Sequence, residues 1–431
     1  MSDSTPIVRD RPIVGIFDAD QPLSLNSVYA ASMLADHGYD VDLFLWRTPQ
    51  DLVALRPMDM VHVHSFSDDE HHSTRGEVPG ALRKTLRTYP PLRRSRMMVH
   101  RGREMIEVAK RLVAGRDEFY LLPKSVFEST LSISNGRRYK CLIGIEKMGL
   151  IWAGFVADRM KTPLLYWSKE LYINHHPKYR GAKFAYLRKA ERTYHRRSLA
   201  TIIQDRERAK VLLRENRIRS TEVLYVPTPV RGEPVSTKTD YFQKKFSVSR
   251  DKRLMLYFGD ITPKRFCLEI AQAAQSFPEE WLVVMHGPVS HSDVAYIDAV
   301  KKVDVGGRVL FSLDLLPADR MWEVIASADI GLVFYPSQPT NLYMTGLASE
   351  KTGLYLQGGL PVVAFNYPSF EQTIAQGGCG VCISGFHELR QAIATILSRY
   401  GEFRQNAWRC YVQSYEFSRQ FQKVIERISR L

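Results

Sequence analysis

The sequence lacks any apolar run of the length that a membrane-spanning helix requires, roughly 18–20 residues. Its apolar runs, such as 281–285 and 360–365, have the length of strands. Charged residues occupy the first segment, 1–17, where a secretory signal would need an apolar core, so we expect no export signal. We therefore expect a cytoplasmic protein that does not span a membrane.

Cysteine is also scarce, with five in 431 residues, an odd number that gives no disulfide framework. Cys379 and Cys382 form a Cys-x-x-Cys pair within a short apolar strand, and no second cysteine pair or histidine cluster accompanies them. We interpret the pair as part of a core rather than as a metal or redox site. The nearest Asp-x-Asp motif, Asp18-Ala-Asp20, lies in the first half of the chain. We expect neither a metal nor a cofactor.

Low-complexity segments are missing too, because the 26 glycines and 22 prolines are near the average for globular proteins. The length exceeds one ordinary core at about 100–200 residues per domain, which predicts two domains. Strand-like apolar runs alternate with helical patterns, which predicts parallel sheets with helices on both faces and ligands beyond the carboxyl ends of the strands. In the first half the strands are expected at 12–17, 41–46, 60–66, 139–145, 162–168, 200–204 and 222–227.

Two segments break the alternation. Residues 67–138 are charged, basic and interrupted by proline, and we interpret them as an insertion. Residues 228–251 are rich in Pro, Ser, Thr and Lys, which is typical of a linker. A second alternating series follows, with strands expected at 254–259, 281–287, 308–312, 330–336, 361–365 and 379–383.

The predicted fold class is therefore α/β, with two doubly wound, Rossmann-like domains facing across a cleft. We place an acceptor-binding domain at 1–235, a donor-binding domain at 236–405 and a final helix at 406–431 that packs back on the first domain. The cleft is the expected active site.

Short motifs in both halves carry a family resemblance. Gly259 ends a strand six residues before Arg265, and a helix opens after it. Further on come an Asn, a Ser-x-Lys at a helix start and a Gly-x-Pro-Val-Val; the residues are Asn341, Ser349, Lys351, Gly359, Pro361, Val362 and Val363. In the first half, 59–65 matches Asp-x-Val-His-x-His, and 149–172 matches the helix and strand that follow. The chain resembles GT-B glycosyltransferases of the glycogen-synthase-like, retaining class, glycosyltransferase family 4 and its relatives.

The resemblance implies a nucleotide-diphosphate sugar as donor, bound by the second domain. Charge builds on the diphosphate as the glycosidic bond breaks, and fixed cations and helix N-terminal amides stabilise it. Lys351 in the first turn of a helix and Arg265 in a loop leading into one are expected to bind the diphosphate, Arg265 in a bidentate manner. The other donor-binding candidates are Gly259, Lys264, His286, Asn341, Ser349 and Glu350. For Lys264 the alternative is a solvated surface charge, and for Glu350 it is a charge that complements the helix dipole.

The chain departs from the family pattern where two glutamates are usual. By the family's spacing their positions are Gly346 and Leu354, and the second glutamate holds the donor ribose in the family. Asp260 stands where a basic residue often follows the strand-end glycine.

Candidate catalytic residues of the first half are Asp18, Asp20, His64 and Glu170, which we expect beyond the ends of strands. A carboxylate there can bind an acceptor hydroxyl or act as a base. The alternatives are a helix cap or turn role for the aspartates and a hydrogen-bonded core histidine for His64.

Basic residues exceed acidic ones, 60 against 46, for a net charge of +14. Many fall in 83–116 and 178–197, interleaved with apolar residues. Such a surface attracts an anionic membrane, and Arg93, Arg94 and Arg96 are the membrane-binding candidates; the alternative is a solvated helix face. No RNA- or DNA-binding motif accompanies the charge, so we do not expect nucleic acid as a partner.

We therefore expect a metal-independent glycosyltransferase of the hexosyltransferase type. It would move a sugar from a nucleotide sugar to a saccharide acceptor, lipid-linked or polymer-bound, in the cytoplasm or peripherally on the inner membrane face. The alternatives are a GT-B epimerase or phosphorylase, and a basic protein that binds polysaccharide or nucleic acid without catalysis. The sequence leaves open the base, the sugar, the acceptor, the oligomeric state and whether configuration is retained or inverted.

Overall fold

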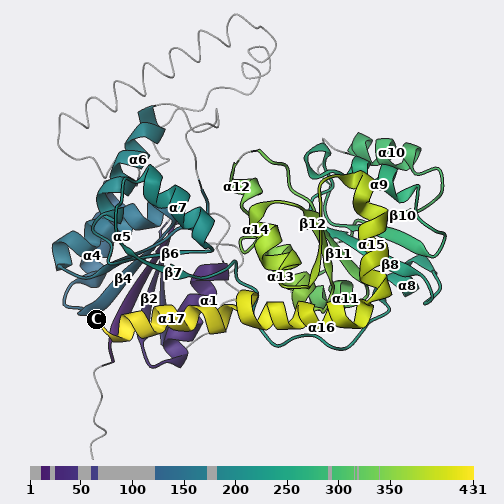
Figure 1. Ribbon diagram of the computed structural model, residues 1–431. Coiled ribbons are helices and arrows are strands. Elements are labelled where there is room, and N and C mark those ends of the chain that lie inside the picture. Colours follow the sequence, from purple (N-terminus) through teal and green to yellow (C-terminus); the bar gives the residue numbers. More distant parts are fainter. Residues whose placement is uncertain are drawn as a thin grey trace, which may run out of the picture. The chain divides into compact units, whose positions relative to one another are not determined.

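The computed structural model describes residues 11–19, 25–46, 60–66, 122–171, 182–289, 294–314, 316–317, 320–338 and 340–431. They form two compact units (Figure 1). The first takes in the described residues within Met1–Ile203, Val211–Leu224 and Lys423–Leu431, and the second those within Gln204–Lys210 and Tyr225–Gln422. Each unit is built on one sheet.

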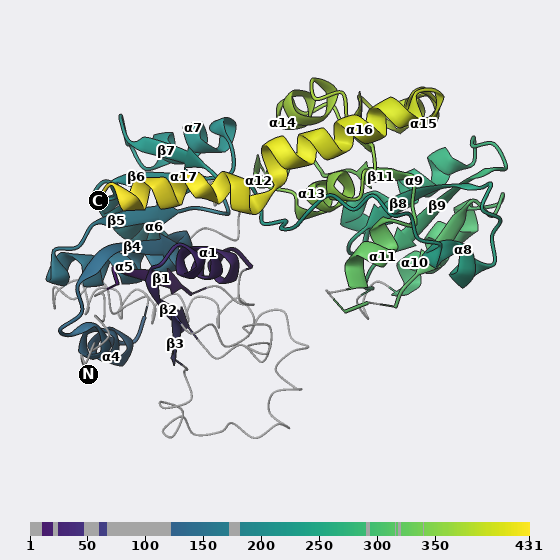
Figure 2. The same ribbon diagram turned by 90° about the horizontal axis from the view of Figure 1, so that it is seen from below.

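The first unit contains a seven-stranded sheet in the order β3-β2-β1-β4-β5-β6-β7, and its paired strands β1 to β6 run parallel. The strands are β1 Ile13–Asp18, β2 Asp40–Trp46, β3 Val61–Phe66, β4 Tyr139–Ile145, β5 Leu164–Trp167, β6 Ala200–Ile203 and β7 Glu222–Tyr225. The helices are α1 Leu25–Asp36, α4 Lys124–Ser134, α5 Glu146–Met160, α6 Ala182–His195 and α7 Arg206–Glu215. Helices α5 and α6 lie on one face of the sheet and α1 on the other (Figures 1 and 2).

Two glycines let α5 approach the strands closely. A Cβ at Gly149 would lie 2.3 Å from the Phe17 carbonyl oxygen, and a Cβ at Gly144 would lie 2.4 Å from the Leu150 Cα. Both distances are shorter than any real contact, so only glycine fits at these positions. The helix therefore starts directly against the carboxyl ends of β1 and β4.

The second unit contains a six-stranded sheet in the order β10-β9-β8-β11-β12-β13, with all neighbours parallel. The strands are β8 Arg253–Phe258, β9 Trp281–His286, β10 Val309–Ser312, β11 Ile330–Val333, β12 Val362–Phe365 and β13 Gly380–Ile383. The helices are α8 Tyr241–Phe246, α9 Cys267–Ala274, α10 Val294–Val303, α11 Met321–Ile325, α12 Thr340–Tyr343, α13 Glu350–Gln357, α14 Pro368–Phe370, α15 Leu389–Ser398, α16 Tyr400–Cys410 and α17 Phe417–Ser429.

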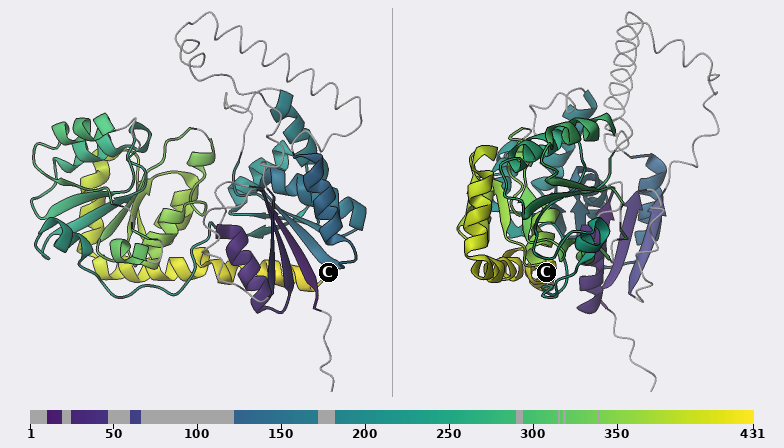
Figure 3. Two further views of the ribbon diagram at one scale, coloured as in Figure 1. Left: turned by 180° about the vertical axis from the view of Figure 1, so that it is seen from behind. Right: turned by 90° about the vertical axis from the view of Figure 1, so that its right-hand side faces the viewer.

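The strands of this sheet are buried on both faces. In β8, Leu254 and Leu256 join the core cluster formed with α13 and α16, whereas Met255 and Tyr257 join the cluster formed with α9 and α15. Continuous apolar runs are expected for strands covered on both sides. The sheet thus lies between two helical layers (Figure 3).

The predicted linker at 228–251 is wrong, because the segment groups with the second unit and two of its apolar residues, Val230 and Phe242, join the core of that unit. Phe242 in α8 is fully buried, and Val230 is 3% exposed and forms a β-bridge with Glu416. The Thr239 hydroxyl donates to the Glu323 carbonyl at 2.6 Å. Isolated apolar residues pack the segment against the second unit, and the sequence of the segment shows no periodic apolar pattern.

The predicted insertion at 67–138 is also too long. Its residues 67–121 lie outside the described part of the chain. In α4, by contrast, Phe127 is fully buried, with its ring centroid 4.3 Å from that of Phe155. Trp152 Nε1 donates to Thr130 Oγ1 at 3.0 Å. Helix α4 therefore packs on α5 as part of the first unit.

The C-terminal residues divide between the units. Residues up to Gln422 group with the second unit, where α16 packs on α13 (Figure 2). Lys423–Leu431 groups with the first unit, and Arg427 Nε lies 2.5 Å from Glu222 Oε2.

Candidate functional site

The donor-side candidates of the second unit gather where β8 ends and α13 begins. Gly259 directly follows β8 and has a φ of +135°, in the region that favours glycine. A Cβ built on Gly259 would lie 3.1 Å from Lys351 Nζ. The absence of a side chain at 259 therefore lets the Lys351 ammonium group rest against the backbone at the strand end.

Helix α13 is fixed at its start by a capping serine. Ser349 Oγ accepts from the Thr352 amide at 3.3 Å and from Thr352 Oγ1 at 2.8 Å, and it lies 3.0 Å from the Tyr335 hydroxyl. Such a cap holds the first helical turn in place. Lys351 in that turn is thereby directed to the carboxyl end of the sheet.

Tyr355, one turn further along, ties α13 to β8. Its hydroxyl accepts from the Phe258 amide at 2.8 Å and donates to the Leu256 carbonyl at 2.9 Å. Tyr355 is fully buried, and its ring lies against Gly331 of β11, where a Cβ would be 2.2 Å from it. These contacts of Tyr355 fix the position of α13 relative to β8 and β11.

Two cations and two tyrosine rings form the centre of this cluster. Lys351 Nζ lies 4.9 Å from the ring centroid of Tyr257 and 5.2 Å from that of Tyr335. Arg265, at the end of the turn Pro263–Arg265, has its guanidinium carbon 5.8 Å from the Tyr335 ring. Among the described residues, no carboxylate lies within the 4.0 Å of an ion pair to either cation.

The electrostatics of the cluster favour an anionic ligand. Burial and the neighbouring Arg265 guanidinium lower the pKa of Lys351 from its usual 10.5 to about 8. Two cations that repel each other gain stability when an anion binds between them. A diphosphate is an anion of suitable charge, and the start of α13 adds backbone amides.

The remaining donor-side candidates are placed differently from one another. Lys264 is exposed in the turn Pro263–Arg265, and Glu350 is the exposed first residue of α13. His286, the last residue of β9, is fully buried; its Nδ1 lies 2.9 Å from Ser312 Oγ and its ring stacks on Phe258. Burial lowers the pKa of His286. Asn341 lies in α12, and its side chain is outside the described part of the chain.

The structure gives a physical reason for one missing glutamate. A Cβ at Gly346 would lie 2.6 Å from the Ser369 carbonyl oxygen, so no side chain fits there without a backbone shift. The Gly346 amide donates to Ser369 Oγ at 3.2 Å, and its carbonyl accepts from the Tyr415 hydroxyl at 2.9 Å. Leu354, at the second position, packs against the apolar core.

Two carboxylates of the first unit lie at the carboxyl edge of its sheet. Asp18 ends β1 and is 1% exposed, and its Oδ2 accepts from Ser27 Oγ in α1 at 2.7 Å. In the register of the sheet Asp18 lies beside Ile145, the last residue of β4. Glu146 follows directly, so the two carboxylates come from adjacent strand ends.

Glu146 is a site candidate that the sequence interpretation missed. It is 3% exposed and has a φ of +56°, which is rare for a residue with a side chain. Its Oε1 accepts from the amide of Glu170 at 2.8 Å and from the amide of Lys169. Strained residues cluster at functional sites, and this one holds the backbone after β5. The Glu170 side chain itself is exposed.

His64 lies within β3, so the expectation that it follows a strand is wrong. Its Nε2 is 3.0 Å from Asp42 Oδ1, and its ring stacks on Phe44 at 4.9 Å. Arg137 and Tyr139 bind the same carboxylate at 2.5 Å. Burial opposes ionisation of Asp42, but the bonds from His64, Tyr139 and Arg137 outweigh it and keep its pKa below the usual value. The network lies toward the amino-terminal half of the sheet.

Several predicted features lie outside the described residues, namely Asp20 and the arginines Arg93, Arg94 and Arg96. No described helix combines the length and apolar character that crossing a bilayer requires. Within the described ranges, no three His, Cys, Asp or Glu side chains group as metal ligands. Cys379 is buried and its thiol donates to the Thr373 carbonyl at 3.5 Å.

Residues 307–419 match the family described as "Glucosyltransferase 3-like, C-terminal domain". No curated protein sequence matches the chain.

Solved structures resemble the whole chain. HepE of Anabaena in complex with UDP is 13% identical, with a TM-score of 0.65 over 97% of this chain and 100% of that one. Sucrose-phosphate synthase of Thermosynechococcus elongatus is 13% identical, with a TM-score of 0.62 over 97% and 100%. WaaG, a glycosyltransferase involved in lipopolysaccharide biosynthesis, is 14% identical, with a TM-score of 0.58 over 96% and 99%. These likenesses confirm the predicted α/β fold with two Rossmann-like domains.

Proposed function

We propose that this chain, a GT-B glycosyltransferase, transfers a sugar from a nucleotide-diphosphate donor held by its second unit to a saccharide acceptor. The observation that carries the donor assignment is the pair of cations, Lys351 and Arg265, without a carboxylate in ion-pair range among the described residues. The glucosyltransferase match at 307–419 covers Lys351, and similar structures are described with UDP and UDP-glucose bound. Both support a nucleotide sugar as donor.

The reaction requires stabilisation of the departing diphosphate. The bond between the sugar C1 and the diphosphate oxygen breaks, and its electron pair stays on that oxygen. Cations that gain interaction energy as this charge grows lower the barrier, because they bind the transition state better than the ground state. Lys351, Arg265 and the amides at the start of α13 supply this stabilisation, and the proposal needs no metal.

The carboxyl edge of the first unit is the proposed acceptor side. The acceptor hydroxyl oxygen forms the new bond to C1, and its proton passes to a base. Asp18 and Glu146 lie at adjacent strand ends, and Glu146 fixes the backbone that carries Glu170. The proposed acceptor is a lipid-linked or polymer-bound saccharide. Separately, Arg93, Arg94 and Arg96 are proposed to bind an anionic membrane surface.

The test of the donor site combines a panel of nucleotide sugars with charge removal. We expect the wild-type chain to hydrolyse one donor slowly without acceptor. Lys351→Ala and Arg265→Ala should each reduce turnover of that donor by an amount equivalent to about 2–4 kcal/mol of transition-state stabilisation. Lys302→Ala, an exposed lysine of α10 in the same unit, is the control. Wild-type turnover and unchanged nucleotide affinity in both site variants would reject the donor assignment.

A further inference from the structure

A polar pocket opens in the second unit at the amino-terminal edge of its sheet. Its cavity volume is about 510 Å³. Arg253, which lines it, is the first residue of β8, and Asp329 directly precedes β11. Gly259 and the donor-side cations lie at the other end of β8, six residues or about 20 Å along an extended strand. The pocket is therefore separate from the proposed donor site.

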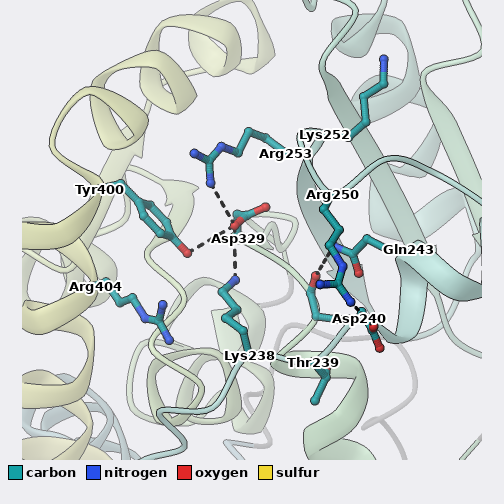
Figure 4. A pocket seen from close by; sticks show the side chains of 11 residues that line it. Lys238, Thr239, Asp240, Gln243, Arg250, Lys252, Arg253, Asp329, Tyr400 and Arg404 are labelled. Atoms are coloured by element: carbon teal, nitrogen blue, oxygen red, sulfur yellow. Dashed lines mark hydrogen bonds and ion pairs between the residues drawn. The ribbon is translucent and has the colours of Figure 1, made fainter.

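Basic side chains outnumber acidic ones in the lining (Figure 4). The pocket is lined by five of them, Lys238, Arg250, Lys252, Arg253 and Arg404, against two carboxylates, Asp240 and Asp329. The excess of positive charge gives the cavity a positive potential.

The carboxylate of Asp329 contacts two basic side chains and a backbone amide at the same time. Its Oδ2 accepts from the Leu254 amide at 2.9 Å. Its Oδ1 lies 3.2 Å from Lys238 Nζ and 3.6 Å from Arg253 Nη1, and it accepts from the Tyr400 hydroxyl at 3.5 Å (Figure 4). One carboxylate thus serves two cations, so half of their charge is uncompensated.

Arg250 and Arg404 show the same imbalance. Arg250 Nη2 lies 2.7 Å from Asp240 Oδ2, but Lys244 also binds that carboxylate at 2.9 Å. Arg404 donates to the Ser236 carbonyl at 2.9 Å, and within the described residues its buried Nε has no hydrogen-bond acceptor. No carboxylate of the described residues lies within ion-pair distance of Arg404.

We propose that this pocket binds the phosphate or diphosphate group of a phosphorylated small molecule at a second site. Guanidinium groups pair with phosphate oxygens in bidentate geometry, and the pocket presents three of them, from Arg250, Arg253 and Arg404. A ligand phosphate there supplies the negative charge that the shared carboxylates do not. The group could belong to a free sugar phosphate or to a lipid headgroup, and the two sources differ in the experiment.

The experiment titrates inorganic pyrophosphate into the full chain by isothermal calorimetry. The donor site is first silenced with Lys351→Ala and Arg265→Ala together. We expect this variant to keep one pyrophosphate site and to lose affinity by about tenfold or more when Arg253→Gln and Arg404→Gln are added, because two charge-assisted contacts to the phosphate oxygens are lost. The matched control is Arg409→Gln, which changes an exposed arginine on the same helix, α16, that carries Arg404. This variant should bind pyrophosphate as before.

Two further arms complete the test. Arg250→Gln with Lys252→Gln removes rim charge without changing Arg404, and it should also weaken binding. This variant replaces the first one if that one fails to fold. Glucose 1-phosphate is compared with phosphatidylcholine vesicles containing phosphatidic acid, and the stronger competitor of pyrophosphate identifies the source. Absence of pyrophosphate binding in the donor-silenced variant, or binding that neither pocket variant weakens, would overturn the proposal.

Discussion

The ammonium of Lys351 is the charge in the donor-side cluster that ordinary pH can change. Its pKa is lowered to about 8 by burial and by Arg265, so the charged form is lost as pH rises through that value. If the ammonium binds the donor diphosphate, nucleotide affinity should fall between pH 7 and pH 9. Nucleotide binding measured by calorimetry across this range checks the prediction.

The matched variant for this prediction is Lys351→Arg, whose guanidinium stays charged throughout the range. It should bind nucleotide with little dependence on pH, whereas Lys302→Ala should keep the wild-type profile. A wild-type affinity that stays constant from pH 7 to pH 9 would contradict the role of Lys351.

A second residue-scale prediction concerns Glu146, whose carboxylate accepts two backbone amides from the segment after β5. Glu146→Ala leaves these amides without their acceptor, and the free energy of unfolding should fall by about 1–3 kcal/mol. Glu146→Gln keeps an acceptor oxygen and should lose clearly less. Urea unfolding of both variants measures the difference, and equal losses would indicate that the amides do not depend on the side-chain oxygen.

At the scale of elements, helix α5 depends on its contact with β1. Gly149→Ala would bring a methyl group to 2.3 Å from the Phe17 carbonyl oxygen. The helix must then move off the strand, which should reduce the free energy of unfolding by about 1–3 kcal/mol.

The control for α5 is Gly401→Ala in α16, where a Cβ would meet nothing within 4 Å. Alanine favours the helix by roughly 0.5–1 kcal/mol over glycine, so this change should stabilise the protein or leave it unaltered. Thermal unfolding of the pair separates crowding from helix propensity. Similar effects at both positions would refute the contact with Phe17 as the cause.

The strands could be predicted well because their apolar runs are continuous and bounded by turns. In β8 the residues Leu254, Met255, Leu256 and Tyr257 divide between two core clusters, which is the arrangement a run without polar gaps indicates. Phe242 could not be placed in this way. Its burial results from contacts with distant residues, and its neighbours in sequence show no periodic pattern.

The sequence indicates which strand ends to inspect for candidate site residues. It does not indicate which residues contact one another there. The rule that ligands bind after parallel strands also singles out Glu146, which directly follows a strand-like run. The Asp-x-Val-His-x-His motif indicated His64 instead. That histidine belongs to the Asp42 network, whose partners Arg137 and Tyr139 are about 95 residues away in sequence. Such partners cannot be identified from one sequence, because spacing along the chain does not determine them.

At the scale of the whole molecule, the predicted fold with two Rossmann-like domains is confirmed by similar structures that cover nearly the full chain. The stereochemical outcome is the next property to determine. We expect the product to retain the donor configuration, because a retaining enzyme needs mainly positioning and electrostatic stabilisation at C1, which Lys351 and Arg265 can provide. NMR of the product anomer measures this directly.

An inverted product would contradict this expectation and would require a base in the first unit. Conversion of Asp18, Asp20, Glu146 and Glu170 to the corresponding amides, one at a time, would then identify the base as the position whose change abolishes turnover. Glu146→Gln also serves as an internal check, because its effect on unfolding is measured separately.

The missing side chain at Gly259 makes two positions of the chain genetically dependent on each other. A Cβ at position 259 would lie 3.1 Å from Lys351 Nζ. Any larger residue there would therefore push the Lys351 ammonium away from the strand end. Gly259→Ala should therefore reduce donor affinity in the wild-type background but add nothing to that loss in a Lys351→Ala background. In a library of double variants, the pair would appear as strong epistasis for nucleotide binding, while the backbone cost of a side chain at a φ of +135° would remain additive in stability.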